Sequence, residues 1–258
     1  MKNKNILVTG AFGFVGKKII QEFLEQKNTV ICVDKQSEQS KKIINKLKKK
    51  YKDKFFYFYC DFESNLQIEA LINFINHRFS QLDVMINNAS ITGDSLNKGW
   101  NVKFNKQSLE NFEKALKVNL VSIFQLSKGL KKIITKKQTS SIINISSIYS
   151  SLGPDKELYK GTNIFNPAAY GSSKAGIEQL TRWLAVEFAP NARVNCIAPG
   201  GIERKQSKNF IKKYTKKTLL KRMATEDDVV NLIMFLASDK SDYITGQEIV
   251  IDGGLSII

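Results

Sequence analysis

The chain of 258 residues has little of the chemistry used in metal centres and disulfides: one histidine, His77, and three cysteines, Cys32, Cys60 and Cys196. The cysteines are odd in number and each lies in an apolar run, so we expect buried, reduced thiols. The histidine is expected on a surface helix face. Such dispersed nitrogen and sulfur donors favour no metal site.

Long apolar runs are also missing. No stretch approaches the roughly 18 residues that a membrane-spanning helix needs. The segment MKNKNILVTG enters a β-rich run almost at once, which leaves no room for a signal peptide. The sequence therefore predicts a cytoplasmic protein without a membrane partner.

Acidic residues are scarce beside basic ones, with 24 Asp and Glu against 40 Lys and Arg and a formal net charge of +16. This charge favours anionic ligands such as nucleotides. The lysines form runs at 41–54, 131–137 and 205–217, which we interpret as solvated helix faces. No nucleic-acid partner is predicted, because no helix-turn-helix, zinc-finger or RNA-binding aromatic signature accompanies the charge.

The chain does have a regular alternation of β-rich and amphipathic segments. The apolar runs NILVTG, TVICVD, FFYFYC, DVMINNA, SIINISS, ARVNCIAP and EIVIDGG are typical of parallel strands covered on both faces. Helical patterns lie between them at 14–26, 37–51, 64–80, 106–134, 167–189 and 225–238. We predict an α/β fold with a doubly wound parallel sheet of about seven strands, helices on both faces, and a single domain over residues 1–258.

A glycine turn, VTGAFGFVG, follows the first predicted strand and leads into a helix. Such a turn lets the backbone approach a pyrophosphate, which the N–H groups and the positive end of the helix stabilise. Asp34 ends the second strand, where a carboxylate can accept hydrogen bonds from an adenosine ribose and repel a 2′-phosphate. The predicted cofactor is NAD. NADP stays open, because Lys35 could instead bind that phosphate.

The segment AAYGSSK places Tyr170 four residues before Lys174, on one helix face. Asn166 is expected to cap this helix and Pro167 to take its first position. A tyrosine of pKa about 10 is a poor base, but a nearby ammonium and a bound cationic nicotinamide would stabilise its phenolate. The pair is a candidate acid/base device. The alternative is a tyrosine in core packing and a lysine that reaches solvent.

Seven motifs in order resemble the short-chain dehydrogenase/reductase family in its compact form. They are TGAFGFVG, NNAS (87–90), KVNL (117–120), NISS (144–147), YGSSK (170–174), RVNCIAPGGI (193–202) and ITGQEIVIDGG (244–254). The resemblance extends from residue 5 to the C-terminus and implies a Rossmann-type NAD(P)-dependent oxidoreductase acting on CH–OH groups. Three positions depart from the pattern: Phe14 replaces a glycine, Ser90 replaces the last residue of NNAG, and Arg204 replaces a threonine that holds the nicotinamide amide in many relatives.

The resemblance also implies roles for single residues. Tyr170 would be the acid/base, Ser147 rather than Ser146 would hydrogen-bond the substrate oxygen, and Asn119 would hold a water that links Lys174 to solvent. Asp61 would accept from the adenine amino group or, alternatively, cap a helix. The cofactor-binding residues are predicted to be Gly10, Phe12, Gly13, Phe14, Val15, Gly16, Asp34, Asp61, Phe62, Asn88, Ala89, Ser90, Tyr170, Lys174, Pro199, Gly200 and Ile202.

The segment between Ser147 and Tyr170 is longer than the family usually needs and borders the predicted substrate site. Its polar and aromatic side chains suit a sugar-like small molecule, and a second loop adds one indole to the same rim: Tyr149, Tyr159, Asn163, Asn166 and Trp100. Such long segments resemble those of dehydrogenases of bacterial surface-sugar and flagellin-glycan pathways. Nearby basic residues either recognise an anionic sugar or belong to ordinary lysine-rich surface: Lys156, Lys160, Arg204 and Lys205.

Two other functions fit the same sequence features, and the resemblance also implies a homo-oligomer. A 3-oxoacyl-thioester reductase shares the framework but usually prefers NADPH. A nucleotide-sensing or nucleic-acid-binding protein would use the positive charge without catalysis, although sensors of this fold commonly lose the Tyr–Lys pair that this chain retains. The resemblance further implies a homodimer or homotetramer, with Trp183 and Phe188 supplying apolar area.

Overall fold

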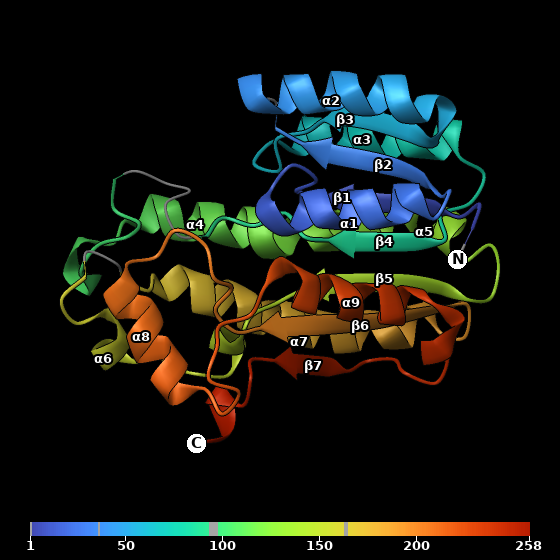
Figure 1. Cartoon of the computed structure of the whole chain (residues 1–258). Helices are drawn as coiled ribbons and strands as arrows, with labels where there is room; N and C mark the ends of the chain where they lie inside the picture. The colour runs from blue at the N-terminus through green and yellow to red at the C-terminus, as the bar shows by residue number, and fades with distance from the viewer. Residues whose placement is uncertain (1, 36, 93–97, 163–164) are drawn as a thin grey trace.

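The computed structural model describes residues 2–35, 37–92, 98–162 and 165–258. Within them, seven strands form one parallel sheet in the order β3-β2-β1-β4-β5-β6-β7 (Figure 1). The strands are β1 (Asn5–Thr9), β2 (Thr29–Asp34), β3 (Phe55–Tyr59), β4 (Val84–Asn87), β5 (Ser140–Ile145), β6 (Ala192–Pro199) and β7 (Glu248–Ile251). The predicted doubly wound parallel sheet is confirmed.

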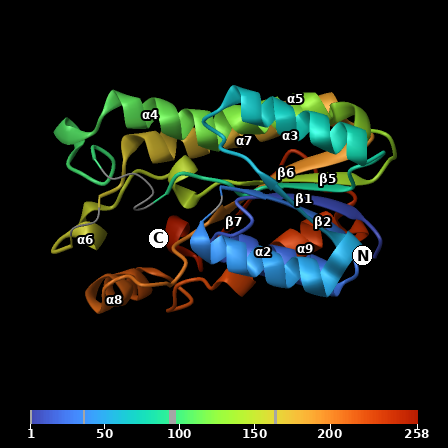
Figure 2. The same ribbon diagram turned by 90° about the horizontal axis from the view of Figure 1, so that it is seen from above.

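Helices cover both faces of this sheet (Figure 2). One face carries α1 (Phe14–Glu25), α2 (Glu38–Tyr51) and α9 (Glu226–Ala237); the other carries α3 (Asn65–Arg78), α4 (Leu109–Leu116), α5 (Ser122–Ile134) and α7 (Ala168–Phe188). Because strand side chains alternate, Leu7 enters one buried cluster while Ile6 and Val8 enter the other. Short 3₁₀ turns lie at Lys52–Lys54, Phe104–Lys106, Ile148–Ser150, Asp239–Ser241 and Leu255–Ile257.

The predicted helix at 106–134 is divided by a π-helical turn. Lys117–Val121 forms this turn between α4 and α5, and Asn119 lies at its centre. Single π turns inside α-helices occur frequently at functional sites, because they redirect a side chain without ending the helix. Hydrophobic periodicity alone does not reveal such a turn.

The start of α7 differs from the prediction. Pro167 is the N-cap, with no side-chain capping bond, and the helix begins at Ala168. The Asn166 side chain hydrogen-bonds the side chains of Tyr149 and Tyr159 instead. The predicted Asn166 cap is therefore wrong, because a tertiary contact takes the amide away from the helix end.

The exposed face of α7 is apolar in part. Trp183 is 55% exposed and Val186 is 82% exposed. Phe188 is only 2% exposed and belongs to the core on the α7 side of the sheet. The prediction that Phe188 supplies interface area is wrong, because its ring points toward the sheet.

Two helices outside the six predicted ranges lie beyond the carboxyl ends of the strands: α6 (Lys156–Tyr159) and α8 (Lys208–Lys217) (Figures 1 and 2). They pack on each other through a third buried cluster of Leu158, Phe210, Tyr214 and Met223. The Lys217 ammonium pairs with Asp155, and Lys213 Nζ donates to two carbonyl groups of the α6 segment. We call this pair of helices the cap.

The scarce cysteine and histidine side chains lie at separate places in the described structure. Cys32, Cys60 and Cys196 are free and buried, and His77 is exposed on α3. Within the described residues there is no cluster of three or more His, Cys, Asp or Glu suited to a metal ion. No helix in that part of the chain is both long and apolar enough to cross a membrane.

Candidate active site

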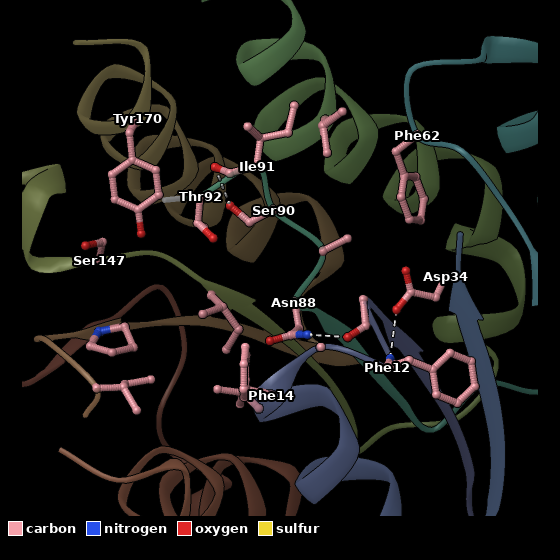
Figure 3. Close-up of a pocket in the computed structure, with 18 of the residues that line it drawn as sticks. Phe12, Phe14, Asp34, Phe62, Asn88, Ser90, Ile91, Thr92, Ser147 and Tyr170 are labelled. Atoms are coloured by element: carbon pink, nitrogen blue, oxygen red, sulfur yellow. Dashed lines mark hydrogen bonds between the residues drawn. The ribbon is translucent and has the colours of Figure 1, made fainter. Parts of the chain in front are cut away.

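A pocket of about 730 Å³ lies at the carboxyl ends of the strands (Figure 3). In a parallel sheet the loops that follow the strands meet at one edge, so segments far apart in the sequence line it together. The lining includes most of the predicted cofactor residues: Gly10, Phe12, Gly13, Phe14, Val15, Asp34, Phe62, Asn88, Ala89, Ser90, Tyr170, Lys174, Pro199, Gly200 and Ile202. Gly16 and Asp61 are outside this lining.

The glycine turn is shaped by close packing. Gly10 has φ +63°, and a Cβ there would lie 2.8 Å from the Cα of Ala89; a Cβ at Gly16 would overlap the carbonyl oxygen of Gly10. Gly13 is the N-cap of α1, and it has no side chain that could cap the first-turn N–H groups. These N–H groups have no partner within the helix, and the residues at this helix end line the pocket. The helix end therefore fits a pyrophosphate.

A hydrogen-bond network holds this turn against β4. Asn88 Nδ2 donates to the carbonyl oxygens of Gly10 at 2.9 Å and Thr9 at 3.1 Å. Thr9 Oγ1 accepts from the backbone N–H groups of Asn88 and Ala89, both at 3.0 Å. The amide of Asn88 thus fixes the shape of the turn (Figure 3).

Asp34 lies at the end of β2 with its carboxylate in the pocket. Oδ2 accepts from the Phe12 N–H and Oδ1 from the Lys35 N–H, both at 2.7 Å (Figure 3). Burial raises the pKa of Asp34, and these two hydrogen bonds oppose the rise. These two hydrogen bonds fix the orientation of the carboxylate. Its remaining acceptor sites are available to a ribose bound in the pocket.

Lys35 is engaged by two other carboxylates. Its Nζ lies 2.9 Å from Asp61 Oδ2 and 3.3 Å from Glu63 Oε1. The N-cap of α3 is Ser64, whereas Asp61 Oδ1 accepts from the Glu63 N–H at 2.9 Å. The helix-cap alternative for Asp61 is therefore wrong, and its predicted contact with adenine stays a prediction.

Tyr170, Ser147 and Lys174 adjoin one end of the pocket. In Figure 3 the Tyr170 hydroxyl points toward the Ser147 side chain, and both residues line the pocket. Burial raises the pKa of Tyr170, and the neighbouring Ser147 hydroxyl and the charge of Arg204 oppose this rise. The two hydroxyl groups are close enough to contact one substrate oxygen together.

Lys174 is only 2% exposed, which excludes the alternative of a lysine that reaches solvent. Its Nζ donates to the Ile145 carbonyl at 2.7 Å and lies 5.7 Å from the centroid of the Tyr170 ring. Burial lowers the pKa of Lys174 to about 7. At neutral pH the protein alone therefore holds both the charged and the neutral form of this amine.

Ser146 and Asn119 contact the same helix from two sides. The Ser146 hydroxyl donates to the Lys174 carbonyl at 3.1 Å. The Asn119 side chain accepts from the Ile91 N–H at 2.7 Å and donates to Ser173 Oγ at 2.9 Å. The buried amide joins the π turn, the loop after β4 and α7. Its predicted part in a proton relay stays a prediction.

The predicted substrate residues are arranged unevenly. The hydroxyl oxygens of Tyr149 and Tyr159 lie 2.5 Å apart, and the Tyr149 ring packs edge-on against Tyr170 at 6.5 Å. Trp100 is 1% exposed, so its prediction on the rim is wrong, because the large indole packs within a core cluster. Asn163 lies outside the described residues.

Of the four basic residues predicted near the rim, Arg204 lines the pocket. Lys156, Lys160 and Lys205 are exposed, and Lys160 lies 3.7 Å from Glu157. The lining also includes residues that the sequence analysis did not assign to this pocket: Ser37, Ser40, Cys60, Glu63, Ile91, Thr92, Val118, Ile145, Ser146 and Gln206. Ile91 and Thr92 directly follow the NNAS motif, so extending it would have found them; Gln206 carries no comparable signal.

Comparisons with known proteins add to this geometry. The family model described as enoyl-(acyl carrier protein) reductase matches residues 10–256. The chain is 31% identical to the post-translational flagellin modification protein A of Campylobacter coli, over 98% of each chain. It is 30% identical to a 3-oxoacyl-[acyl-carrier-protein] reductase of Aquifex aeolicus, over 99% of this chain and 98% of that protein. A solved short-chain dehydrogenase from Leptospira borgpetersenii with bound NAD+ is 31% identical, with a TM-score of 0.84, and the match covers 99% of this chain and 94% of that one.

Proposed function

Since this chain belongs to the short-chain dehydrogenase/reductase family of NAD(P)-dependent oxidoreductases, we propose that it transfers hydride between NAD(H) and a sugar-like alcohol or ketone. The observation that carries the proposal is that the Tyr170 hydroxyl points toward Ser147 in a pocket that the buried Lys174 also lines (Figure 3). A lone tyrosine in core packing would need neither partner. Three polar groups from two elements instead meet at one end of the pocket.

In this proposal Tyr170 moves the proton. The bound nicotinamide supplies the hydride when a ketone is reduced and accepts it when an alcohol is oxidised. Ser147 donates to the substrate oxygen, and Tyr170 gives that oxygen a proton in reduction or removes one in oxidation. Lys174, once protonated, stabilises the phenolate that remains.

Tyr170→Phe tests the proposal directly, because it removes the hydroxyl and keeps the ring that packs against Tyr149. Loss of the general acid/base is expected to lower kcat/KM by about 10²–10⁴-fold. NADH affinity should stay within about twofold, which fluorescence titration measures. Undiminished turnover by the variant would refute the assignment.

We propose NAD rather than NADP as the preferred cofactor. The Asp34 carboxylate adjoins the pocket, and the Lys35 ammonium is already paired with Asp61 and Glu63. A 2′-phosphate would therefore meet the negative charge of Asp34, while the adjacent Lys35 is already paired. Asp34→Ala is therefore expected to raise the affinity for NADP relative to NAD.

The sugar-like substrate is supported by the long segment before α7. It supplies Tyr149 and Tyr159, whose paired hydroxyls lie beside Tyr170, and it forms α6 of the cap. A relative at 31% identity is named for flagellin modification, which agrees with a role in a surface-sugar pathway. The second candidate, a 3-oxoacyl-thioester reductase, is favoured by relatives of that name.

A substrate panel separates the two candidates. Sugar acids, nucleotide sugars and 3-oxoacyl thioesters are each offered with NADH and with NADPH, and products are identified by mass spectrometry. Turnover of the sugar compounds with NADH supports the first proposal. Activity confined to acyl thioesters or simple aliphatic alcohols would reject it.

We also propose that the chain acts as a single domain and assembles into a homodimer or homotetramer. One sheet contains all the described strands, which supports the single domain. Exposed apolar side chains on the neighbouring helices α5 and α7 support the assembly: Phe124, Trp183 and Val186. Light scattering at micromolar concentration tests it, and a monomeric mass would contradict it.

A further inference from the structure

Two departures from the family pattern meet in space, and we propose that they act together: Arg204, supported by the ring of Phe14, binds the diphosphate of the dinucleotide cofactor. The Arg204 Cζ lies 4.5 Å from the centroid of the Phe14 ring. Phe14 is the first residue of α1, and Arg204 belongs to the loop after β6. Two residues far apart in the sequence therefore form one contact at the N-terminus of α1.

The guanidinium is held in place without using all its donors. Arg204 Nε lies 3.4 Å from Glu226 Oε1, and the Arg204 N–H donates to Gln206 Oε1 at 2.7 Å. Gln206 Nε2 in turn donates to the Ile202 carbonyl at 2.8 Å. Within the described residues, Nη1 and Nη2 have no hydrogen-bond partner. These two nitrogens can form the planar fork that suits phosphate oxygens.

Arg204 differs in this respect from the other cations that line the pocket. The Lys35 ammonium pairs with Asp61 and Glu63, and the buried Lys174 ammonium donates to a backbone carbonyl. Among the cations that line the pocket, Arg204 is the one that can offer two neighbouring N–H donors in a planar fork. A diphosphate at the α1 N-terminus carries two negative charges, and a guanidinium beside the helix end would neutralise part of them.

The position along the pocket favours the diphosphate over the substrate. Phe14 fixes the guanidinium beside the first turn of α1, where the unpaired N–H groups lie. Arg204 also lowers the pKa of Tyr170, so its charge is felt at the acid/base end of the pocket. A guanidinium that contacts Phe14 and lines the same pocket as Tyr170 suits the part of a dinucleotide that joins the two nucleosides. The aromatic face of Phe14 restricts the arginine and adds a cation–π contact.

Arg204→Ala in the full-length protein tests the inference by ligand affinity without turnover. NADH affinity is measured by fluorescence, and ADP and adenosine are measured by competition against it. Loss of a charge-assisted contact is expected to weaken NADH and ADP by about tenfold and to leave adenosine, which has no phosphate, within about twofold. Lys205→Ala, the matched control on the adjacent exposed lysine, should change none of the three affinities.

Two further variants test the contact itself. Phe14→Leu keeps an apolar side chain but removes the aromatic face, so NADH and ADP should weaken by about threefold. The same change should add almost nothing in an Arg204→Ala background, because the two residues act through one contact. Arg204→Lys keeps the charge without the planar fork and should fall between the parent and Arg204→Ala. Thermal melts establish that each variant is folded.

Unchanged ADP affinity in both folded Arg204 variants would overturn the inference. Equal weakening of ADP and adenosine would overturn it too, because the loss would then not depend on phosphate. If NADH affinity is kept while the KM for the substrate rises, Arg204 binds the substrate and the inference is again wrong. Fully additive effects of the Phe14 and Arg204 changes would refute the paired action.

Discussion

Replacing Asp34 with alanine should change the choice between NAD and NADP. Asp34, Lys35, Asp61 and Glu63 together carry three carboxylates and one ammonium, a formal charge of −3 + 1 = −2. The change removes one negative charge from the residue that adjoins the pocket and leaves the ion pairs of Lys35 intact. The Phe12 N–H also loses its acceptor, which affects both cofactors alike.

The size of the change follows from Coulomb interaction and hydrogen bonding. A unit charge about 5 Å from a phosphate charge contributes about 3 kcal/mol at an effective dielectric constant near 20. Partial exposure and salt reduce this to about 1–2 kcal/mol, or roughly 5–30-fold in NADP affinity. NAD loses its hydrogen bonds to a charged acceptor, each worth about 1.5–3 kcal/mol, or roughly 10–100-fold. The NADP-to-NAD affinity ratio should therefore rise by roughly 50-fold or more.

The assay compares dissociation constants of NADH and NADPH for the parent and the variant at one fixed ionic strength. Adding Lys35→Ala to Asp34→Ala is the control, since it removes any cation that turns toward the phosphate after the first change. An unchanged ratio in Asp34→Ala, or a parent that already prefers NADPH, would show that this carboxylate does not decide cofactor choice.

Two predictions concern pH. The pKa of Lys174 is lowered by burial from 10.5 to about 7, so between these values the unfolded chain binds more protons and the free energy of unfolding rises with pH. Lys174→Met should lose that rise in denaturant titrations from pH 7 to 9, and parallel curves for the two proteins would contradict the assigned pKa. The pKa of Glu248 is raised by burial and by the neighbouring Glu178 from 4.5 to about 7, so the folded protein holds an extra proton and its stability falls as pH rises through this interval. Glu248→Gln should show a smaller drop in Tm between pH 5 and 8 than the parent, and an equal drop would refute the argument.

Local sequence patterns predicted the features that depend on neighbours along the chain. The seven strands follow from apolar runs, the turn at Gly10 and Gly16 from close backbone packing, and the shared face of Tyr170 and Lys174 from helix periodicity. Each of these needs only a few consecutive residues to specify it.

Features that depend on distant packing were not predictable in the same way. Trp100 and Phe188 are as apolar as exposed aromatic residues elsewhere, and only the packed structure shows that they are buried. Asn166 has the chemistry of a helix cap, yet the hydroxyls of two tyrosines engage its amide. The contact between Phe14 and Arg204 joins the first residue of α1 to the loop after β6, and no local pattern connects these two positions.

The cap has a buried cluster of its own, separate from the two clusters that hold the sheet. Substitutions at Leu158 and Phe210 can therefore change the cap while the two clusters that hold the sheet keep their packing. The cap is therefore a region in which substitutions can change the substrate that is bound while Tyr170, Ser147 and Lys174 are kept.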